Sequence, residues 1–285
     1  MTQTWTTLAV LDWTTKRFAD HGIGAARLEA QLLLAYALKC SRTLLYMNFD
    51  QPLGDAELAS YRELIKRRLG GEPVAYLVHE HEFWGMPLTI EPAVLVPRPD
   101  TETVVEVART FRADRSAPCR VLDLCTGSGA IALALAKELP AAQVIATELS
   151  PEAAAIARAN VERNQLVGRV EVREGDLWAP VAGDRFDLIV SNPPYIRTAV
   201  IATLSAEVKR EPVMALDGGA DGLAFYDRIC AAARDFLVPG GALVVEHGFD
   251  QADTVRARFE AAGFQHVTGV NDLGKNPRVT HGLAP

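Results

Sequence analysis

From Asp100 onward, the chain alternates short apolar runs with segments of helical pattern. Apolar runs rich in branched residues are typical of buried parallel strands, and strands that alternate with helices form a sheet covered on both faces. The expected strands are 121–124, 144–147, 170–172, 186–191 and 242–246, with final strands through Phe264, Val267 and Val279. The expected helices are one over 104–107 capped by Asp100 or Thr101, 130–137, one that begins at Ser150-Pro151-Glu152, 222–236 and 251–262. We therefore expect an α/β fold from residue 100 to residue 285.

Two segments of different character precede this region. Residues 1–72 read as helices with two apolar stripes, the first formed by Leu28, Leu32, Ala35 and Leu38, and the second by Leu58, Tyr61, Leu64 and Leu69. Asp55 opens the second helix, Gly70-Gly71 closes it, and Ser41 caps a short piece between the two. Residues 73–99 predict a β-hairpin linker, on the basis of Phe83-Trp84, Pro87, Leu88-Thr89-Ile90 and Val94-Leu95-Val96.

The composition argues against several classes of protein. The formal net charge is −7, which disfavours tight, sequence-independent binding to nucleic-acid backbones. The four cysteines form no CxxC pair, so we expect a reduced, cytoplasmic protein without a disulfide framework. His79 and His81 alternate as on a strand but lack a third ligand, so we expect no metal site. The start, Met1 to Trp5, lacks the features of a signal peptide, and no apolar run is long enough to span a bilayer.

Asn192-Pro193-Pro194-Tyr195 comes directly after the expected strand 186–191. Open α/β sheets bind ligands at the carboxyl ends of their strands, so this tetrapeptide is placed at a binding edge. Two prolines fix φ and remove two backbone donors, which leaves the Asn192 side chain and the neighbouring carbonyls as rigid acceptors. A planar amino group, such as a carboxamide or the exocyclic amine of adenine, fits these acceptors, with Tyr195 against its flat face. The alternative is a turn that only ends the strand.

The loop Cys125-Thr126-Gly127-Ser128-Gly129 lies between an expected strand and a helix, where glycines let the backbone approach a ligand. It lacks the third glycine of the pattern Gly-x-Gly-x-x-Gly, which disfavours a dehydrogenase. Acidic residues stand at three strand ends: Asp123 toward the amino-acid end of a cofactor, Glu148 for two ribose hydroxyls, and Asp176-Leu177 for an adenine. Each acid alone is compatible with a helix cap or a solvated charge. Together they form the layout of S-adenosylmethionine-dependent methyltransferases.

Several motifs in combination resemble the HemK/PrmC family, over essentially residues 20–283. They are Asp123-Leu-Cys-Thr-Gly-Ser-Gly129, Val190-Ser-Asn-Pro-Pro-Tyr195, Glu82-Phe83, Val96-Pro-Arg-Pro-Asp-Thr-Glu102, Glu211-Pro212, 218–223 and Glu246-His-Gly248. The resemblance implies a Rossmann-like class I S-adenosylmethionine methyltransferase domain at 100–285, a small N-terminal helical substrate-recognition domain at 1–72, and a β-hairpin linker at 73–99. Enzymes of this family methylate N5 of the glutamine in the Gly-Gly-Gln motif of class 1 peptide chain release factors, which modulates translation termination.

The resemblance also implies a set of site residues. S-adenosylmethionine, which leaves as S-adenosylhomocysteine, would be bound by Gly127, Gly129, Glu148, Leu177 and Asn192. The segment from Asn192 to Tyr195 would hold the glutamine side chain, with Asn192 and the Pro193 carbonyl as acceptors. Phe83 would be a pocket wall or, equally, a core aromatic. The expected partner is a class 1 release factor bound by a monomer, with no nucleic-acid substrate and no membrane.

Two positions depart from the family pattern. Cys125 stands where the family usually has the first glycine of the loop, which makes this loop similar to that of a related enzyme acting on a glutamine of a ribosomal large-subunit protein. Arg98-Pro-Asp-Thr-Glu102 and Arg278-Val279 favour the release factor instead. His79-Glu80-His81 replaces a glycine and a basic residue, and surface-exposed linker residues are expected there. The remaining alternatives are a nucleophilic Cys125, an adenine or guanine substrate, and a non-catalytic binding module.

Overall fold

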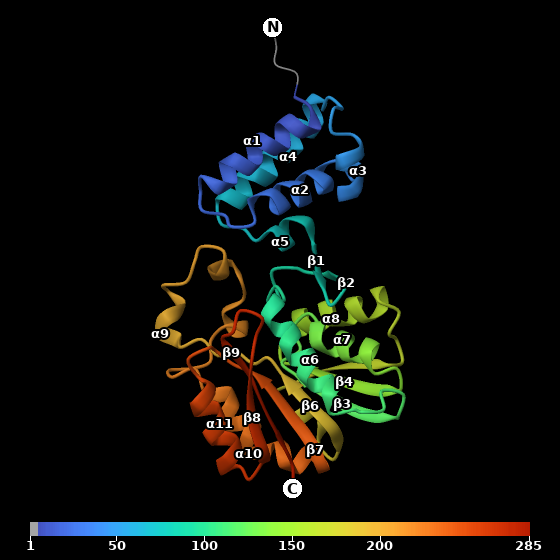
Figure 1. The fold of residues 1–285 in the computed structure, drawn as a ribbon, viewed down its shortest axis with the longest axis vertical. Helices are drawn as coiled ribbons and strands as arrows, with labels where there is room; N and C mark the ends of the chain where they lie inside the picture. The colour runs from blue at the N-terminus through green and yellow to red at the C-terminus, as the bar shows by residue number, and fades with distance from the viewer. Residues whose placement is uncertain (1–4) are drawn as a thin grey trace. The chain divides into compact units, whose positions relative to one another are not determined.

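The computed structural model describes residues 5–285; the four residues before them, part of the start for which no signal peptide is expected, lie outside this range. The chain forms two compact units, coloured along the sequence in Figure 1. The helical unit contains the residues up to His79 together with Ser205–Arg210, and the sheet unit contains Glu80–Leu204 and Glu211–Pro285. Within the described residues, every helix is too short or too polar to cross a membrane.

The helical unit confirms the helices predicted in the first part of the chain. It consists of α1 (Thr7–Ala19), α2 (Ala26–Ala37), α3 (Arg42–Met47), α4 (Asp55–Leu69), α5 (Val74–Val78) and the 3-10 turn η3 (Val208–Arg210). The Ser41 hydroxyl accepts a hydrogen bond from the Leu44 N–H and so caps α3, as expected. Helix α4 begins at Asp55 and ends before Gly70, which is also as predicted.

The predicted apolar stripe of α2 is wrong in part. Leu28 is 42% exposed, whereas Ala30, Leu33 and Leu34 are buried in the core of the helical unit. Helix α2 is apolar around most of its circumference, so leucine spacing alone does not identify the face that is buried. The buried face is instead determined by the packing of α2 against α1 and α4.

A buried ion-pair cluster holds the two chain segments of the helical unit together. Arg68 of α4 pairs with Glu29 of α2 at 2.6 Å and with Glu207 at 2.8 Å, and its side chain is only 6% exposed. A buried arginine needs such partners because an unpaired charge is costly to remove from water. Ser205–Arg210 therefore belongs to the helical unit although it is separated from α4 by more than a hundred residues of sequence.

The sheet unit contains the remaining elements. Its strands are β1 (Glu80–Phe83), β2 (Met86–Thr89), β3 (Cys119–Leu124), β4 (Ala142–Glu148), β5 (Val170–Glu174), β6 (Phe186–Ser191), β7 (Leu237–Glu246), β8 (Gln265–Asn271) and β9 (Pro277–Leu283). Its helices are α6 (Glu102–Thr110), α7 (Ala130–Glu138), α8 (Pro151–Arg163), α9 (Thr198–Ile201), α10 (Ala224–Phe236) and α11 (Ala252–Ala261). Its 3-10 turns are η1 (Pro99–Thr101), η2 (Ala179–Val181) and η4 (Val213–Ala215).

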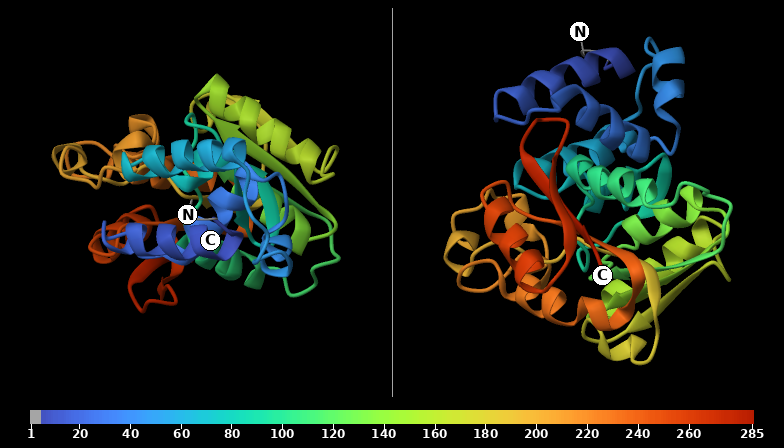
Figure 2. Two further views of the ribbon diagram at one scale, coloured as in Figure 1. Left: turned by 90° about the horizontal axis from the view of Figure 1, so that it is seen from above. Right: turned by 60° about the horizontal axis from the view of Figure 1, so that its bottom comes forward.

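Seven strands form one mixed sheet in the order β5-β4-β3-β6-β7-β9-β8. Strands β3 to β7 are parallel, and β9 runs antiparallel between β7 and β8. Helices α6, α7 and α8 cover one face and α10 and α11 the other, as Figures 1 and 2 show. The chain order reverses between β3 and β6, and this is the position where open α/β sheets bind ligands.

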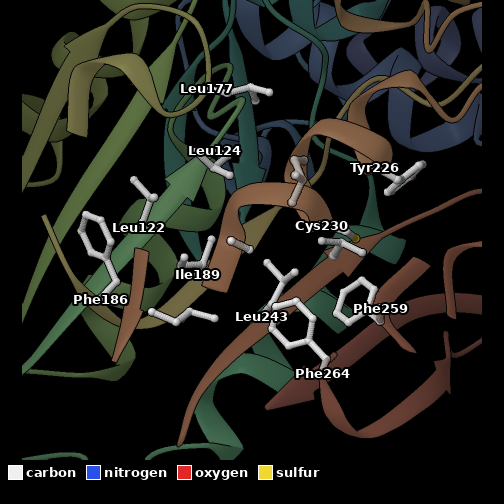
Figure 3. Close-up of a cluster of buried hydrophobic side chains, with 14 of the residues drawn as sticks. Leu122, Leu124, Leu177, Phe186, Ile189, Tyr226, Cys230, Leu243, Phe259 and Phe264 are labelled. Atoms are coloured by element: carbon white, nitrogen blue, oxygen red, sulfur yellow. The ribbon is translucent and has the colours of Figure 1, made fainter. Parts of the chain in front are cut away.

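The core between the sheet and helices α10 and α11 explains the orientation of β3. Leu122 and Leu124 point into this core together with Tyr226 of α10 and Phe259 of α11 (Figure 3). Successive side chains of a strand alternate between the two faces, so Asp123 points toward the opposite layer. A carboxylate in the middle of this apolar strand is therefore buried under the helices of the other face.

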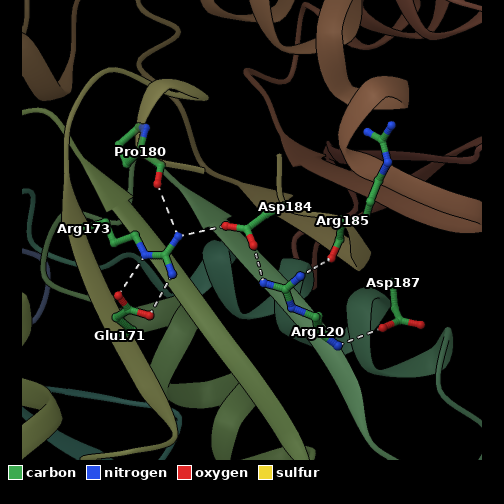
Figure 4. A network of polar contacts seen from close by, with 7 residues as sticks. All are labelled: Arg120, Glu171, Arg173, Pro180, Asp184, Arg185 and Asp187. Carbon is green, nitrogen blue, oxygen red and sulfur yellow. Dashed lines mark hydrogen bonds and ion pairs between the residues drawn. The ribbon is translucent and has the colours of Figure 1, made fainter. Parts of the chain in front are cut away.

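Charged residues bind the loop before β6 to two strands. Arg173 of β5 contacts Glu171 and Asp184 at 2.8 Å, and Asp184 also accepts from Arg120 of β3 at 2.7 Å (Figure 4). Asp187 accepts from the Arg120 backbone N–H at 2.8 Å. Because these side chains are partly exposed, the pairs stabilise the fold only modestly, and their geometry chiefly fixes where β6 begins.

The linker contains the predicted hairpin, β1 and β2, but Val94-Leu95-Val96 is not a strand. Pro92 and Pro97 flank this run and lack the N–H donors that a sheet ladder requires. Val94 and Val96 are nevertheless buried, so the run is an apolar loop packed on the sheet unit. Thr101 stands at the N-cap position of α6, as expected, but its side chain makes no capping hydrogen bond.

Candidate active site

A cavity of about 310 Å³ opens at the carboxyl ends of β3, β4, β5 and β6. Its volume lies in the range of ligand pockets. Nine of the residues predicted for the site line it: Cys125, Thr126, Gly127, Ser128, Glu148, Asp176, Leu177, Asn192 and Pro194. The other five, Phe83, Asp123, Gly129, Pro193 and Tyr195, do not line this cavity. The strand ends that the sequence places in chain order thus meet at one edge of the sheet.

The loop after β3 has a conformation that favours glycine at three positions. The φ angles of Cys125, Gly127 and Gly129 are 59°, 56° and 85°. A Cβ atom at Gly129 would lie 2.8 Å from Leu133, whereas at Gly127 it would meet no atom within 4 Å. The open side of Gly127 is therefore where a ligand can approach the backbone. Cys125 adopts the left-handed conformation without being a glycine, and burial raises the pKa of its thiol, which disfavours the nucleophilic role.

Glu148 connects the glycine loop to the second strand. One carboxylate oxygen accepts from the Gly127 N–H at 2.9 Å and the other from the Ser150 N–H at 3.0 Å. A carboxylate has about four lone-pair sites, so two acceptor positions remain for the hydroxyls of a ligand. Glu148 thus combines a structural role in the loop with a free acceptor edge at the cavity.

Asp123 lies beneath the loop rather than in the cavity. It is fully buried, and one oxygen accepts from the Thr126 hydroxyl at 2.6 Å and from the Ala132 N–H at 3.2 Å. Its other oxygen has no partner in the described part of the chain. Burial raises the pKa of this carboxyl to about 7. Asp123 therefore holds the loop against α7, and any contact with a ligand requires that the loop or a water molecule transmit it.

Asn192 is held by its amide nitrogen. Its Nδ2 donates to the Thr101 hydroxyl at 3.2 Å, and within residues 5–285 its Oδ1 is left as an unused acceptor beside the cavity. The Tyr195 hydroxyl donates to Glu246 at 3.3 Å, so the tyrosine side chain turns toward the end of β7. Burial and the nearby Glu246 raise the pKa of Tyr195, and this hydroxyl stays protonated. The two ends of the tetrapeptide are thus anchored by side chains from other segments, the turn before α6 and the end of β7.

The other motifs of the resemblance support this tetrapeptide. Glu211 is almost fully buried and accepts from Arg98 with both oxygens, at 2.7 and 2.8 Å. This pair fixes the segment that carries Thr101. The Gln251 amide donates to the carbonyls of Tyr195 and Gly222 at 3.0 and 3.1 Å. The motifs far apart in sequence are therefore parts of one scaffold around Asn192.

Some lining residues were missed by the sequence analysis. Phe225 offers an aromatic wall, and Ala93, Val94 and Leu95 form a second side of the cavity. Thr101 was expected only as a helix cap, yet it lines the cavity and binds Asn192. Its place in the Val96-to-Glu102 motif could have indicated a role in the site, because a helix cap alone does not require so long a motif.

Phe83, His79 and His81, which the sequence analysis considered, lie outside the cavity. Phe83 is buried in the hairpin, in the core position that was the alternative to a pocket wall. His79 caps α5 in a left-handed conformation and is exposed, so the two histidines do not alternate along one strand. His81 is half-buried in β1, and burial lowers its pKa. Among residues 5–285, no cluster of three or more histidine, cysteine or acidic side chains could hold a metal ion.

The sheet order, the glycine loop and the acidic strand ends together define a class I S-adenosylmethionine-dependent methyltransferase. Residues 106–210 match the methyltransferase small domain, and residues 9–78 match the PrmC N-terminal domain. A methyltransferase from Pyrococcus furiosus shares the fold, with a TM-score of 0.54, 22% identity, and coverage of 79% of this chain and 98% of that one.

Relatives along nearly the whole length identify the family. The chain is 48% identical over 279 residues to the release factor glutamine methyltransferase of Geobacter sulfurreducens, covering 98% of this chain and 96% of the relative. It is 44% identical over 259 residues to that of Xylella fastidiosa strain 9a5c, covering 91% and 94%. The chain belongs to the PrmC/HemK family of release factor glutamine methyltransferases.

The residues present fit S-adenosylmethionine. The open face of Gly127 lets a ligand approach the backbone, and the free acceptor edge of Glu148 can bind hydroxyl groups. Leu177 and Phe225 form an apolar wall of the same cavity. Asp176 forms an ion pair with Arg228, which fixes its carboxylate at the rim of the cavity. The predicted cofactor residues other than Asp123 and Gly129 thus line one ligand-sized space.

We expect Glu148→Ala to weaken the binding of S-adenosylhomocysteine by about 1.5–3 kcal/mol, because two ribose hydroxyls would lose a charged acceptor. Calorimetry measures this directly. Glu174→Ala is the matched control, since Glu174 pairs in register with Glu148 at the end of β5 but lies outside the cavity. An unchanged dissociation constant for Glu148→Ala, with a normal melting temperature, would refute the ribose assignment.

Proposed function

We propose that this enzyme transfers a methyl group from S-adenosylmethionine to N5 of the glutamine in the Gly-Gly-Gln motif of class 1 release factors. The orientation of Asn192 carries the proposal. Because its Nδ2 is occupied by Thr101, its Oδ1 is available to accept a hydrogen bond from a carboxamide N–H. The carbonyl of Pro193 is the second acceptor in this proposal, and two acceptors match the two N–H bonds of a glutamine side chain.

The reaction needs positioning more than acid–base chemistry. When bound, S-adenosylmethionine supplies an electrophilic methyl group. A carboxamide nitrogen is a weak nucleophile, and hydrogen bonds from its N–H groups to Asn192 and Pro193 strengthen as positive charge develops on it. The proline-fixed backbone and the anchors at Thr101 and Glu246 hold these acceptors in place before the substrate arrives. The proton can leave to water after the transfer.

Mass spectrometry distinguishes the candidate substrates. The enzyme is incubated with labelled S-adenosylmethionine and, in separate reactions, with a class 1 release factor, its Gln→Ala variant in the Gly-Gly-Gln motif, ribosomal large-subunit proteins and RNA. We expect a gain of one methyl group on the glutamine of the unmodified release factor. Efficient labelling of a ribosomal protein or of RNA, with none on the release factor, would overturn the assignment.

We propose that residues 1–72 recognise the body of the release factor and that residues 100–285 perform the chemistry. Residues 73–99 would link these two parts. A shallow groove of the helical unit supports this division. It is lined by Trp13, Arg17, Arg62, Ile65, Lys66, Leu69 and Gly70. Trp13 is 50% exposed, and the three basic side chains contrast with the net charge of −7 of the chain. An exposed tryptophan among basic residues suits an acidic protein surface.

Charge reversal tests this surface better than deletion, because Glu207 and the rest of Ser205–Arg210 would lose their partners if residues 1–72 were removed. We expect Arg17→Glu combined with Arg62→Glu to raise KM for the intact release factor on the order of tenfold, by opposing the approach of an acidic surface. KM for a short Gly-Gly-Gln peptide should change much less. Arg256→Glu on α11 is the control reversal. Equal effects on both substrates would assign the helical unit a purely structural role.

We further infer that the enzyme works as a monomer in the cytoplasm. The four cysteines are free thiols, and Cys119 and Cys230 are buried. This pattern agrees with a reducing compartment. Light scattering of the purified protein at several concentrations is the measurement that checks the monomer.

A further inference from the structure

Four side chains lie together in a polar row behind the cavity. Asn192 Nδ2 donates to Thr101 Oγ1 at 3.2 Å, and the Tyr195 hydroxyl donates to Glu246 Oε1 at 3.3 Å. The Thr101 side chain neighbours the Glu246 carboxyl and acts to lower its pKa, as a donor to the ionised form does. The residues come from three separate segments: the turn before α6, the loop after β6 and the end of β7. Pairing of Ser191 with Val245 places Asn192 and Glu246 at neighbouring strand ends.

The direction of the hydrogen bonds follows from counting protons. A threonine hydroxyl has one proton to donate. If that proton goes to the Glu246 carboxylate, Thr101 can only accept from Asn192, and the side of the Asn192 amide that faces Thr101 must be the NH2 group. The oxygen must then face the cavity. The two ends of an amide have nearly the same shape, so a partner of fixed polarity is what distinguishes them.

We propose that Thr101 and Glu246 are positioning residues that fix the amide of Asn192 with its oxygen toward the substrate. This inference rests on the proposed function, in which Oδ1 of Asn192 accepts from the substrate amide. Thr101 transmits the polarity, and the ionised Glu246 determines it.

The surroundings of Glu246 make it a buried acceptor. Its side chain is 1% exposed, and Oε2 has no hydrogen-bond partner among the residues that the structure describes. The charged and titratable groups that face it are Arg278 of β9, Asp100 of η1 and Tyr195, and Tyr226 of α10 binds its backbone carbonyl. Arg278 is shared with Asp100 and Asp272, which leaves Glu246 only partly compensated. Burial is the main cause that raises the pKa of Glu246 to about 7.

Protonation of Glu246 would reverse this order of donors and acceptors. A neutral carboxyl can donate to Thr101, which can then donate its own proton to the oxygen of Asn192. The amide would turn and present NH2 to the substrate, where two donors would face each other. The rate of methyl transfer should therefore be highest above about pH 7, where Glu246 is ionised, and should fall as the pH drops through that value.

Thr101→Val and Thr101→Ser test the first link, because valine keeps the shape of threonine without the hydroxyl. We expect Thr101→Val to lower kcat on the order of tenfold or more while the affinity for S-adenosylhomocysteine stays nearly unchanged, and Thr101→Ser to restore most of the rate. In a double-mutant cycle, Thr101→Val should add little to Asn192→Ala. If Asn192→Ala is inactive but Thr101→Val transfers normally, or if the two effects add, the inference is wrong. If Asn192→Ala itself transfers normally, the proposed role of Asn192 fails first.

Glu246→Gln and Glu246→Ala test the second link through a pH profile of single-turnover rates from about pH 6 to about pH 8.5. The glutamine oxygen can still accept from Thr101 and Tyr195 but does not ionise in this range. We expect Glu246→Gln to recover most of the rate lost in Glu246→Ala and to lose the acid limb near pH 7. Burial also raises the pKa of Asp123 to about 7. If the rate of Glu246→Gln still falls at acid pH, another group such as Asp123 causes the fall, and the proposed role of Glu246 is wrong. Melting temperatures confirm that each variant is folded.

Discussion

Asn192→Ala should lower the single-turnover rate of methyl transfer on the order of 10²–10³-fold, the size of effect seen when one preorganised hydrogen-bonding group is removed from a transition state. The mutation removes the only side-chain acceptor that the tetrapeptide offers to the substrate amide, and alanine cannot replace it. The affinity for S-adenosylhomocysteine should change little, because Glu148 and the glycine loop remain. The loss should therefore appear in kcat rather than in cofactor binding.

Asn164→Ala is a suitable control for this experiment. Asn164 also donates its amide nitrogen, to the Pro87 carbonyl at 3.1 Å, but it lies at the end of α8. Its loss should leave the transfer rate of the folded enzyme close to that of the unchanged chain. If Asn192→Ala transfers methyl at a normal rate under single-turnover conditions, Asn192 is not the acceptor of the substrate amide.

The parts of the site that could be predicted are those that belong to strand ends. Apolar runs fix where β3, β4 and β6 lie, and parallel strands end at one edge, so Gly127, Glu148 and Asn192 could be brought together from their order alone. The helical part was equally visible, because α4 is bounded by Asp55 and Gly70. Termination signals are local and can be read directly, whereas the leucine spacing of α2 did not identify its buried face.

The partners of Asn192 could not be predicted in the same way. Thr101 lies 91 residues before it, and Glu246 follows at the end of β7. Their meeting depends on strand order and on the path of the segment before α6, neither of which has a periodic signal. Val94-Leu95-Val96 shows the opposite failure: a branched apolar run suggested a strand, whereas the flanking prolines and the packing produce a loop.

Gly222→Ala should also reduce methyl transfer strongly, although Gly222 does not line the cavity. Its φ angle is 77°, and a Cβ atom there would lie 2.4 Å from the Tyr195 carbonyl oxygen and 2.7 Å from the Gln251 amide nitrogen. Gln251 is the residue that holds that same carbonyl. The alanine must therefore push the end of the tetrapeptide away or break its support. A misplacement of about 1 Å at a reacting group can cost on the order of 10²-fold in rate, and we expect a loss of kcat of this size.

Gly240→Ala separates this local displacement from a general loss of stability. Gly240 has nearly the same conformation, with φ of 74°, but a Cβ atom there would meet nothing within 4 Å. Both alanines bear the strain of the left-handed conformation, about 1–2 kcal/mol, so Gly240→Ala measures the loss of melting temperature that this strain alone causes, and the overlaps at Gly222 should lower it further. Only Gly222→Ala should lower the single-turnover rate of the folded protein, with S-adenosylhomocysteine affinity retained. Equal rates for the two variants would mean that the tetrapeptide tolerates displacement, and the argument that rigid acceptors drive the reaction would have to be abandoned.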